Sequence, residues 1–164
     1  MDHEALVRRA VAVARRSREN GNHPFGAILV GPDGSVLLEA ENGVPEFHDC
    51  TMHAETRLVS EASKKFPRDF LSRCTLYSSA EPCAMCAGAI YWSGIGTLVY
   101  GLSEASLKKL TGDDPENPTL ELPCREVFAR GQRAVEVFGP LCEVESSYVH
   151  VGFWNPQDEN GGNL

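Results

Sequence analysis

The sequence lacks any long apolar run, and no stretch approaches the roughly 18 residues that suggest a membrane-spanning helix. Its first twenty residues, MDHEALVRRAVAVARRSREN, are charged throughout and lack the apolar core of a secretory signal peptide. Internal repeats, linkers and low-complexity segments are also missing. We therefore expect one domain over residues 1–154, a frayed tail over 155–164, no membrane association and a cytoplasmic location.

Positive charge is scarce in the last third of the chain. Residues 111–164 carry 3 basic and 10 acidic side chains and contribute −7 of the net charge of −8. Residues 1–110 carry 12 basic and 13 acidic side chains, a net −1. A surface of this kind repels polyphosphate, so we do not expect a nucleic-acid partner.

The periodicity of apolar residues predicts an alternation of helices and strands. A helix is expected over 2–20 and a hairpin over 24–40, with its turn at GPDG. The later segments read as helix 51–66, strand 73–80, helix 82–94, strand 96–102, helix 103–110, polar loop 111–123, helix 124–131 and strand 133–139. The segment 143–154 fits either a strand or a helix. This order predicts an α/β fold with a mixed sheet covered by helices.

Six cysteines in a chain expected to be cytoplasmic predict reduced thiols or metal ligands. Cys83 and Cys86, in EPCAMCAG, fall on one face of the first turn of a helix in which Pro82 takes a favoured position. The positive partial charge of a helix N-terminus favours thiolates. A redox pair would require the βαβ context of thioredoxin-like motifs, which the sequence lacks, so the pair favours a metal.

A third ligand lies thirty residues upstream, in His53-Ala54-Glu55. His53, Cys83 and Cys86 predict one tetrahedral zinc ion per chain, with its fourth position open to water. His53 and Glu55 point about 200° apart on a helix, so both can face one site only if the zinc lies near the helix N-terminus.

A closed structural zinc site is the alternative. Its fourth ligand would come from Cys50, Cys74, Cys124, Cys142 or His48. Structural zinc sites usually combine two short Cys/His hairpins rather than one histidine and one cysteine pair. A closed site would also leave Glu55 without a role, and the catalytic interpretation is favoured mainly by the motif signature described below.

An open zinc site of this kind suits hydrolysis, and the signature described next implies an amidine-like ring carbon as the centre that is attacked. Zinc lowers the pKa of bound water enough to supply hydroxide near neutral pH. A carboxylate beside the metal can carry protons to the ring nitrogen and to the departing amino group. Glu55 is the candidate for this role.

His-x-Glu followed by Pro-Cys-x-x-Cys is the signature of the zinc-dependent nucleobase deaminases. Between Pro24 and Gly101 the chain resembles the cytidine deaminase-like family through HPFGAILV, AENG, TMHAE, EPCAMCAGAIYWSGI and LVYGLS. It is most similar to the guanine deaminase branch and next to the tRNA adenosine deaminases. The resemblance implies a three-layer αβα sandwich around a mixed five-stranded sheet, and a homodimer.

The resemblance also implies substrate contacts. They are the side chains of Asn42, Phe25, Trp92 and Asp114 and the backbone N–H of Ala54. In guanine-type members an aromatic residue precedes two aspartates, whereas TGDDPENP has Gly112 there, and Asp113 is the alternative to Asp114. The C-terminal stretch SSYVHVGFW is expected to close the pocket of its own or a neighbouring chain through Tyr148, Phe153 or Trp154.

The expected function is zinc-dependent deamination of a free nucleobase or small amino-heterocycle, with guanine to xanthine plus ammonia first. Deamination of tRNA adenosine to inosine is the next alternative, and deamination of cytosine or isocytosine is a third. A non-catalytic zinc-binding module is the alternative from a different class, and the presence of Glu55 argues against it.

Overall fold

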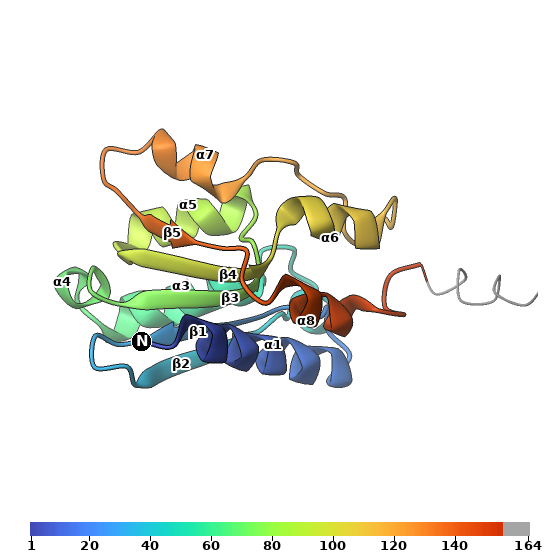
Figure 1. The fold of residues 1–164 in the computed structure, drawn as a ribbon, viewed down its shortest axis with the longest axis horizontal. Helices are drawn as coiled ribbons and strands as arrows, with labels where there is room; N and C mark the ends of the chain where they lie inside the picture. Colours follow the sequence, from blue (N-terminus) through green and yellow to red (C-terminus); the bar gives the residue numbers. More distant parts are fainter. Residues whose placement is uncertain (156–164) are drawn as a thin grey trace, which may run out of the picture.

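The computed structural model describes residues 1–155, and its centre is a mixed five-stranded sheet with the order β2-β1-β3-β4-β5 (Figure 1). The strands are β1 (Gly26–Val30), β2 (Val36–Glu41), β3 (Thr75–Ala80), β4 (Thr97–Leu102) and β5 (Glu136–Phe138). β1 runs antiparallel to β2 and β3, whereas β3, β4 and β5 are parallel to one another. The predicted α/β fold with a mixed five-stranded sheet is confirmed.

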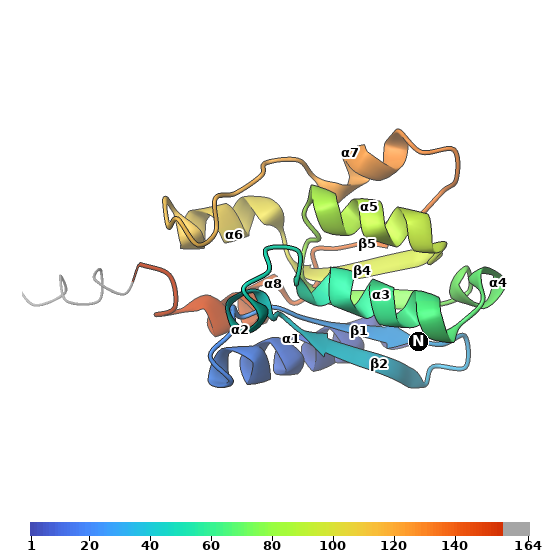
Figure 2. The same cartoon turned by 180° about the vertical axis from the view of Figure 1, so that it is seen from behind.

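Helices cover both faces of the sheet (Figures 1 and 2). They are α1 (His3–Glu19), α2 (Val44–Phe47), α3 (Ala54–Lys65), α4 (Arg68–Leu71), α5 (Ala84–Ser93), α6 (Glu104–Thr111), α7 (Cys124–Ala129), α8 (Glu143–Ser147) and the 3₁₀ helix η1 (Tyr148–His150). α1 lies on one face with α8, and α3 and α5 lie on the other. No helix within residues 1–155 is long and apolar enough to cross a membrane.

Alternating strand residues build a core on each face of the sheet. In β1, Ala27 and Leu29 pack in the cluster beneath α3 and α5, while Ile28 and Val30 pack in the cluster beneath α1. Successive side chains of a strand point to opposite faces, and a strand buried on both faces reads as a continuous apolar run. The run GAILV is therefore the sequence of a central strand.

The ends of several elements differ from the sequence prediction. The helix predicted from residue 51 begins at Ala54, because His53 is extended (φ −65°, ψ 150°) and serves as the N-cap. The short helices α2 and α4 were not predicted as helices. The ambiguous segment 143–154 is helical in α8 and η1.

The predicted frayed tail starts at a residue that is held in place. The backbone N–H of Asn155 donates to Asp114 Oδ2 at 3.0 Å, and its side-chain amide donates to the carbonyl of Thr111 at 2.9 Å. The rest of that tail, 156–164, lies outside the described residues.

One edge of the sheet gathers the polar residues of interest. β2 ends just before Asn42, β3 just before Glu81 and β4 just before Ser103. The start of β1, after Phe25, lies at the same edge because Gly26 pairs with Glu41 at the end of β2. The N-termini of α3, α5 and α6 meet this edge (Figure 2).

Candidate active site

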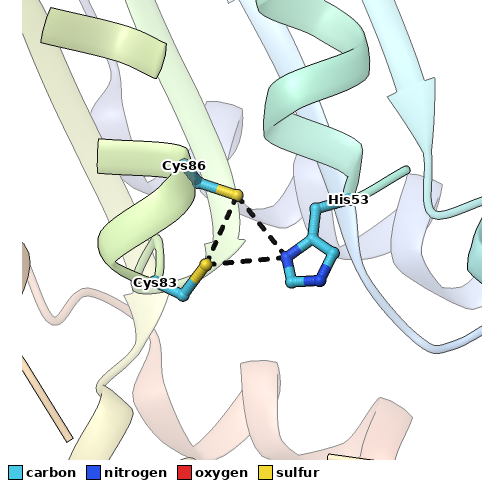
Figure 3. A group of neighbouring side chains, drawn as sticks. All are labelled: His53, Cys83 and Cys86. Atoms are coloured by element: carbon cyan, nitrogen blue, oxygen red, sulfur yellow. Dashed lines mark hydrogen bonds between the residues drawn. The ribbon is translucent and has the colours of Figure 1, made fainter. Parts of the chain in front are cut away.

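The three predicted metal ligands converge from two helix N-termini. His53 is the N-cap of α3, Cys83 is the N-cap of α5 and Cys86 lies in the first turn of α5. Figure 3 shows the three side chains pointing toward one another. His53 Nδ1 lies 3.6 Å from Cys83 Sγ and 3.5 Å from Cys86 Sγ, and the two sulfurs are 3.7 Å apart.

These separations fit a tetrahedral zinc ion. With ordinary zinc–ligand bond lengths, tetrahedral geometry separates two sulfurs by about 3.8 Å and a sulfur from a nitrogen by about 3.6 Å. Among residues 1–155, the only group of three or more candidate metal-binding side chains is His53, Cys83 and Cys86. None of the five alternatives for a closed site joins it, so the structure supports a three-ligand site.

The two thiols are unequal. The hydrogen bond between the two sulfurs, 3.7 Å apart, is the largest cause that lowers the pKa of Cys83, to about 4. The same hydrogen bond, followed by burial, raises the pKa of Cys86. Contact with Cys83 raises the pKa of His53. Cys83 is thus poised as the thiolate that a metal requires.

Glu55 lies beside the ligands without joining them. Its Oε1 accepts a hydrogen bond from the Ser78 hydroxyl at 2.9 Å, and its Oε2 lies 3.6 Å from Cys86 Sγ. The side chain is buried, and burial is the main cause that raises its pKa. A carboxyl group with a raised pKa next to a metal site is suited to pick up and release protons.

A cavity of about 320 Å³ opens in front of this cluster. His53, Glu55 and Cys83 line one part of it. The remaining lining includes Phe25, Asn42, Ala80, Glu81, Met85, Glu104 and Leu107, with His23, Val44, Cys50 and loop residues 116–120. Its volume is at the small end of ligand pockets, which suits a single heterocycle.

Asn42, Phe25 and Ala54 were predicted to contact the substrate. Asn42 is 2% exposed and lines the cavity, and its Oδ1 accepts the N–H of Val44 at 3.0 Å. The amide NH₂ therefore remains to donate to a ligand. Phe25 also lines the cavity. Ala54 is the buried first residue of α3, and contact through its N–H stays a prediction.

Trp92 and Asp114 are not brought into the cavity. Trp92 is 73% exposed near the C-terminal end of α5, and nine positions of helix from Cys83 amount to about 14 Å. Asp114 accepts the N–H groups of Glu116 and Asn155 and holds the loop in shape. The spacing of the motifs does not reveal either placement, because both depend on which way a helix or loop turns.

The expected closing segment lies behind the cavity wall. Phe153 and Trp154 pack around His23, with ring centroids 6.1 and 5.4 Å from its imidazole. Tyr148 is 60% exposed. None of these three aromatic residues lines the cavity in the part of the chain that the structure describes.

Most of the other lining residues were not singled out from the sequence, and those of most interest among them are the titratable pair His23 and Glu116 and the carboxyl group of Glu104. Glu116 Oε2 lies 3.2 Å from His23 Nε2 across the cavity rim, although 93 positions separate the two residues. No sequence pattern links them. Glu104 was placed in a helix but given no role. Its position just after a parallel strand, where α/β proteins bind ligands, was the available signal.

Comparisons with known proteins agree with this geometry. Residues 1–102 match the cytidine and deoxycytidylate deaminase zinc-binding region. The "Probable cytosine deaminase" of Schizosaccharomyces pombe is 44% identical over 151 residues, 92% of this chain and 91% of that protein. The guanine deaminase of Bacillus subtilis is 37% identical over 115 residues, 70% of this chain and 73% of that protein.

A solved structure of guanine deaminase from Nitrosomonas europaea superimposes with a TM-score of 0.73. It is 27% identical and covers 90% of this chain and 81% of that one. The motif, the ligand geometry and these matches lead to one conclusion: the chain belongs to the cytidine and deoxycytidylate deaminase family and is a zinc-dependent deaminase.

Proposed function

We propose that the protein converts free guanine and water into xanthine and ammonia. The observation that carries this proposal is the placement of Asn42 and Glu104 on opposite sides of the cavity. Asn42 follows β2 and Glu104 begins α6 just after β4, while the sheet order is β2-β1-β3-β4. Three strand spacings, about 14 Å, separate the two backbones. Glu55, bonded to Ser78 of β3, lies over a strand between them.

The polar side chains of Asn42 and Glu104, on the two sides of the cavity, match the hydrogen-bonding groups of guanine better than those of cytosine. Beside C2, the atom that carries its amino group, guanine has N1–H and C6=O on one edge and N3 and N9–H on the other. Beside C4, cytosine has N3 and C2=O on one edge but only C–H groups on the other. Cytosine would therefore leave one buried polar side chain without a partner, which costs binding energy.

The chain's own residues account for the proton transfers. Zinc, when bound by His53, Cys83 and Cys86, supplies a water molecule of lowered pKa. Glu55 takes one proton from the attacking water and gives it to N3 as the oxygen joins C2. Glu55 then passes the second proton to the amino group as the C2–N bond breaks, which releases ammonia and leaves the new carbonyl of xanthine. Asn42 donates to C6=O and fixes the orientation of the ring.

Cytosine is the second candidate substrate. The relative named "Probable cytosine deaminase" matches 92% of this chain at 44% identity, a longer and stronger match than the guanine deaminase of Bacillus subtilis. Trp92 and Asp114, which favoured guanine in the sequence, do not line the cavity. The case for guanine therefore depends on the two flanking polar residues.

A tRNA substrate fits the cavity poorly. Glu104, Glu116 and Glu81 line it, and Glu116 stands at the rim with 69% of its side chain exposed. A phosphate backbone approaching this rim meets carboxylates, and the chain beyond residue 110 is strongly acidic. The carboxylates at this rim favour a free base over RNA.

Ammonia release tests the proposal directly. We expect zinc-loaded protein to release ammonia from guanine at least tenfold faster, in kcat/KM, than from cytosine, isocytosine or guanosine. A tRNA stem-loop with adenosine at position 34 should yield no inosine. Release from cytosine alone would move the assignment to the second candidate, and inosine without release from any free base would move it to tRNA.

We also propose that the protein is a homodimer. The helix α5, AMCAGAIYWS, carries no charged side chain, yet Met85 and Trp92 are 37% and 73% exposed. An apolar helix with an exposed face is suited to burial against a second copy. Light scattering should give twice the monomer mass of 17.9 kDa for the wild type. Trp92→Glu should shift the protein toward the monomer, and a wild-type monomer would exclude the dimer.

A further inference from the structure

Glu104 is a buried carboxyl group on the wall of the catalytic cavity. It is the first residue of α6, it is 8% exposed, and it lines the cavity together with His53, Glu55 and Cys83. Carboxyl groups are rarely buried unless they are paired. The environment of Glu104 therefore calls for an explanation.

The backbone around Glu104 is rigidly held. Its N–H donates to Glu81 Oε2 at 2.9 Å, and Glu81 Oε1 accepts the N–H of Cys124 at 3.0 Å. Ser103 caps α6 by accepting the N–H of Ser106 at 3.2 Å, and the Ser103 N–H donates to Glu143 at 3.1 Å. Glu81 is thus occupied by backbone groups, and Glu104 starts from a fixed position.

The Glu104 carboxyl itself has no such partner. Within residues 1–155 no hydrogen bond or ion pair reaches it, whereas Glu55 is bonded to Ser78 and Glu116 to His23. Burial is the largest cause that raises its pKa, to about 7, and nearby Cys83, Glu81 and Glu55 raise it further. A buried carboxyl left without a protein partner in a ligand cavity is suited to bind the ligand.

The guanine edge that faces Glu104 follows from the opposite flank. The Oδ1 of Asn42 already accepts the Val44 N–H, so the NH₂ group is the part of this amide that we expect to donate into the cavity. The C6=O edge of guanine is the natural partner for that donor. The N3 and N9–H edge then points toward Glu104, and a carboxyl oxygen accepts from N9–H in either protonation state.

We propose that Glu104 accepts a hydrogen bond from N9–H of the purine and thereby selects the free base over its nucleoside. In guanosine this nitrogen carries the sugar, so the hydrogen bond is lost and the sugar meets a buried wall. The inference rests on the proposed reaction with guanine. Glu104 would be a substrate-binding residue, separate from proton transfer by Glu55.

Two analogues of equal size place the N–H of the five-membered ring at different positions, N9 in 7-deazaguanine and N7 in 9-deazaguanine, and the Glu104 variants separate the effect of N9–H from that of N7–H. In 9-deazaguanine a C–H replaces N9–H, whereas 7-deazaguanine retains N9–H. We expect the wild type to prefer 7-deazaguanine by at least about tenfold in kcat/KM, the usual effect of losing one hydrogen bond to a carboxyl group. In Glu104→Ala the kcat/KM values for the two analogues should differ by no more than about twofold. Glu104→Gln, which keeps an acceptor oxygen, should retain part of it.

Matched controls separate this role from a structural one. Glu121→Ala removes an exposed carboxylate that pairs with Lys108 at 2.6 Å, and it should keep the wild-type preference. Zinc content should be equal in all variants. Glu55→Gln prevents turnover, so calorimetry on zinc-loaded protein that carries this substitution measures binding alone. The affinities for the two analogues should show the same preference, and adding Glu104→Ala should remove it.

The outcomes are distinguishable. If the wild type neither binds nor deaminates guanine, the proposed function and the inference both fail. If guanine is deaminated but the wild type and Glu104→Ala show the same ratio for the two analogues, only the role of Glu104 is refuted. If Glu104→Ala does not fold, an unchanged ratio in soluble Glu104→Met, which has a similar size but no acceptor oxygen, would refute it equally.

Discussion

The hydroxyl of Ser78 donates a 2.9 Å hydrogen bond to Oε1 of Glu55. Ser78 belongs to the central strand β3, and Glu55 lies in the first turn of α3. The bond leaves Oε2 on the side of Cys86. The sheet thus orients the carboxyl group for which we propose proton transfer relative to His53, Cys83 and Cys86, and the orientation can be tested separately from the chemistry.

Ser78→Ala should keep zinc and fold but lower kcat. A hydrogen bond to a charged group contributes about 1.5–3 kcal/mol, which corresponds to about 10- to 100-fold in rate if it is needed in the transition state. Steady-state kinetics on the zinc-loaded variant measures this loss. Ser60→Ala, on the exposed side of α3, is the control. Equal kcat in both variants would mean that Glu55 needs no support from β3.

Cys83→Ser and Cys86→Ser should each lose zinc. Removing one of three ligands weakens binding strongly, and the unfolding temperature should also fall because the metal ties the starts of α3 and α5 together. Elemental analysis and thermal unfolding of purified protein give both readouts. Cys50→Ser changes a cavity-lining cysteine outside the ligand group and should retain zinc. Full zinc occupancy in both ligand variants would contradict the assignment.

Asp114→Ala should act on the loop rather than on the chemistry. Asp114 accepts the N–H groups of Glu116 and Asn155, and residues 116–120 line the cavity. We expect KM to rise several-fold and hydrogen exchange to increase over 112–120, while kcat stays within about threefold. Asp113→Ala is the matched control in the same loop. A fall in kcat of about 100-fold would instead restore Asp114 as a direct contact of the substrate.

Stability should fall as the pH drops below 6.5. His150 is 2% exposed, and burial lowers its pKa to about 4 from an ordinary 6.5, so the unfolded chain binds a proton that the folded chain rejects. The contribution of His150 to the free energy of unfolding is present above pH 6.5 and is lost progressively between pH 6.5 and 4. Between pH 7 and pH 5 this loss lowers the free energy of unfolding by about 2 kcal/mol.

Urea unfolding at pH 7 and pH 5 measures this effect, with His150→Gln for comparison. The decrease in the free energy of unfolding from pH 7 to pH 5 should be smaller in the variant than in the wild type by about 2 kcal/mol. An equal loss in both proteins would show that His150 does not carry the pH dependence.

The elements with a strong local pattern could be predicted from the sequence. GAILV and the apolar residues of 2–20 specify a buried strand and an amphipathic helix by themselves, and both are present as β1 and α1. The start of α3 could not be placed as well. Thr51 resembles a helix start, but its N–H and hydroxyl both bond to Asp49, and the helix begins three residues later.

The clustering of the three candidate metal ligands could be predicted because metal-binding chemistry is tied to short spacings. His53, Cys83 and Cys86 need only two helix starts, which the sequence marks with HAE and PCAMC. The cavity wall could not be predicted in the same way. Whether Trp92 or Glu104 lies near the substrate depends on helix length and on the strand order β2-β1-β3-β4. A short sequence motif specifies neither the helix length nor the strand order.

The most direct test of the account is a single turnover of guanine in ¹⁸O-labelled water by zinc-loaded wild type and Glu55→Gln. The account predicts xanthine that carries one ¹⁸O atom and an equal amount of ammonia from the wild type. The variant should bind zinc equally but react at least about 100-fold more slowly, since proton transfer by one positioned group supplies at least that factor. Xanthine formation at the same rate in both proteins, or no xanthine from the wild type, would contradict it.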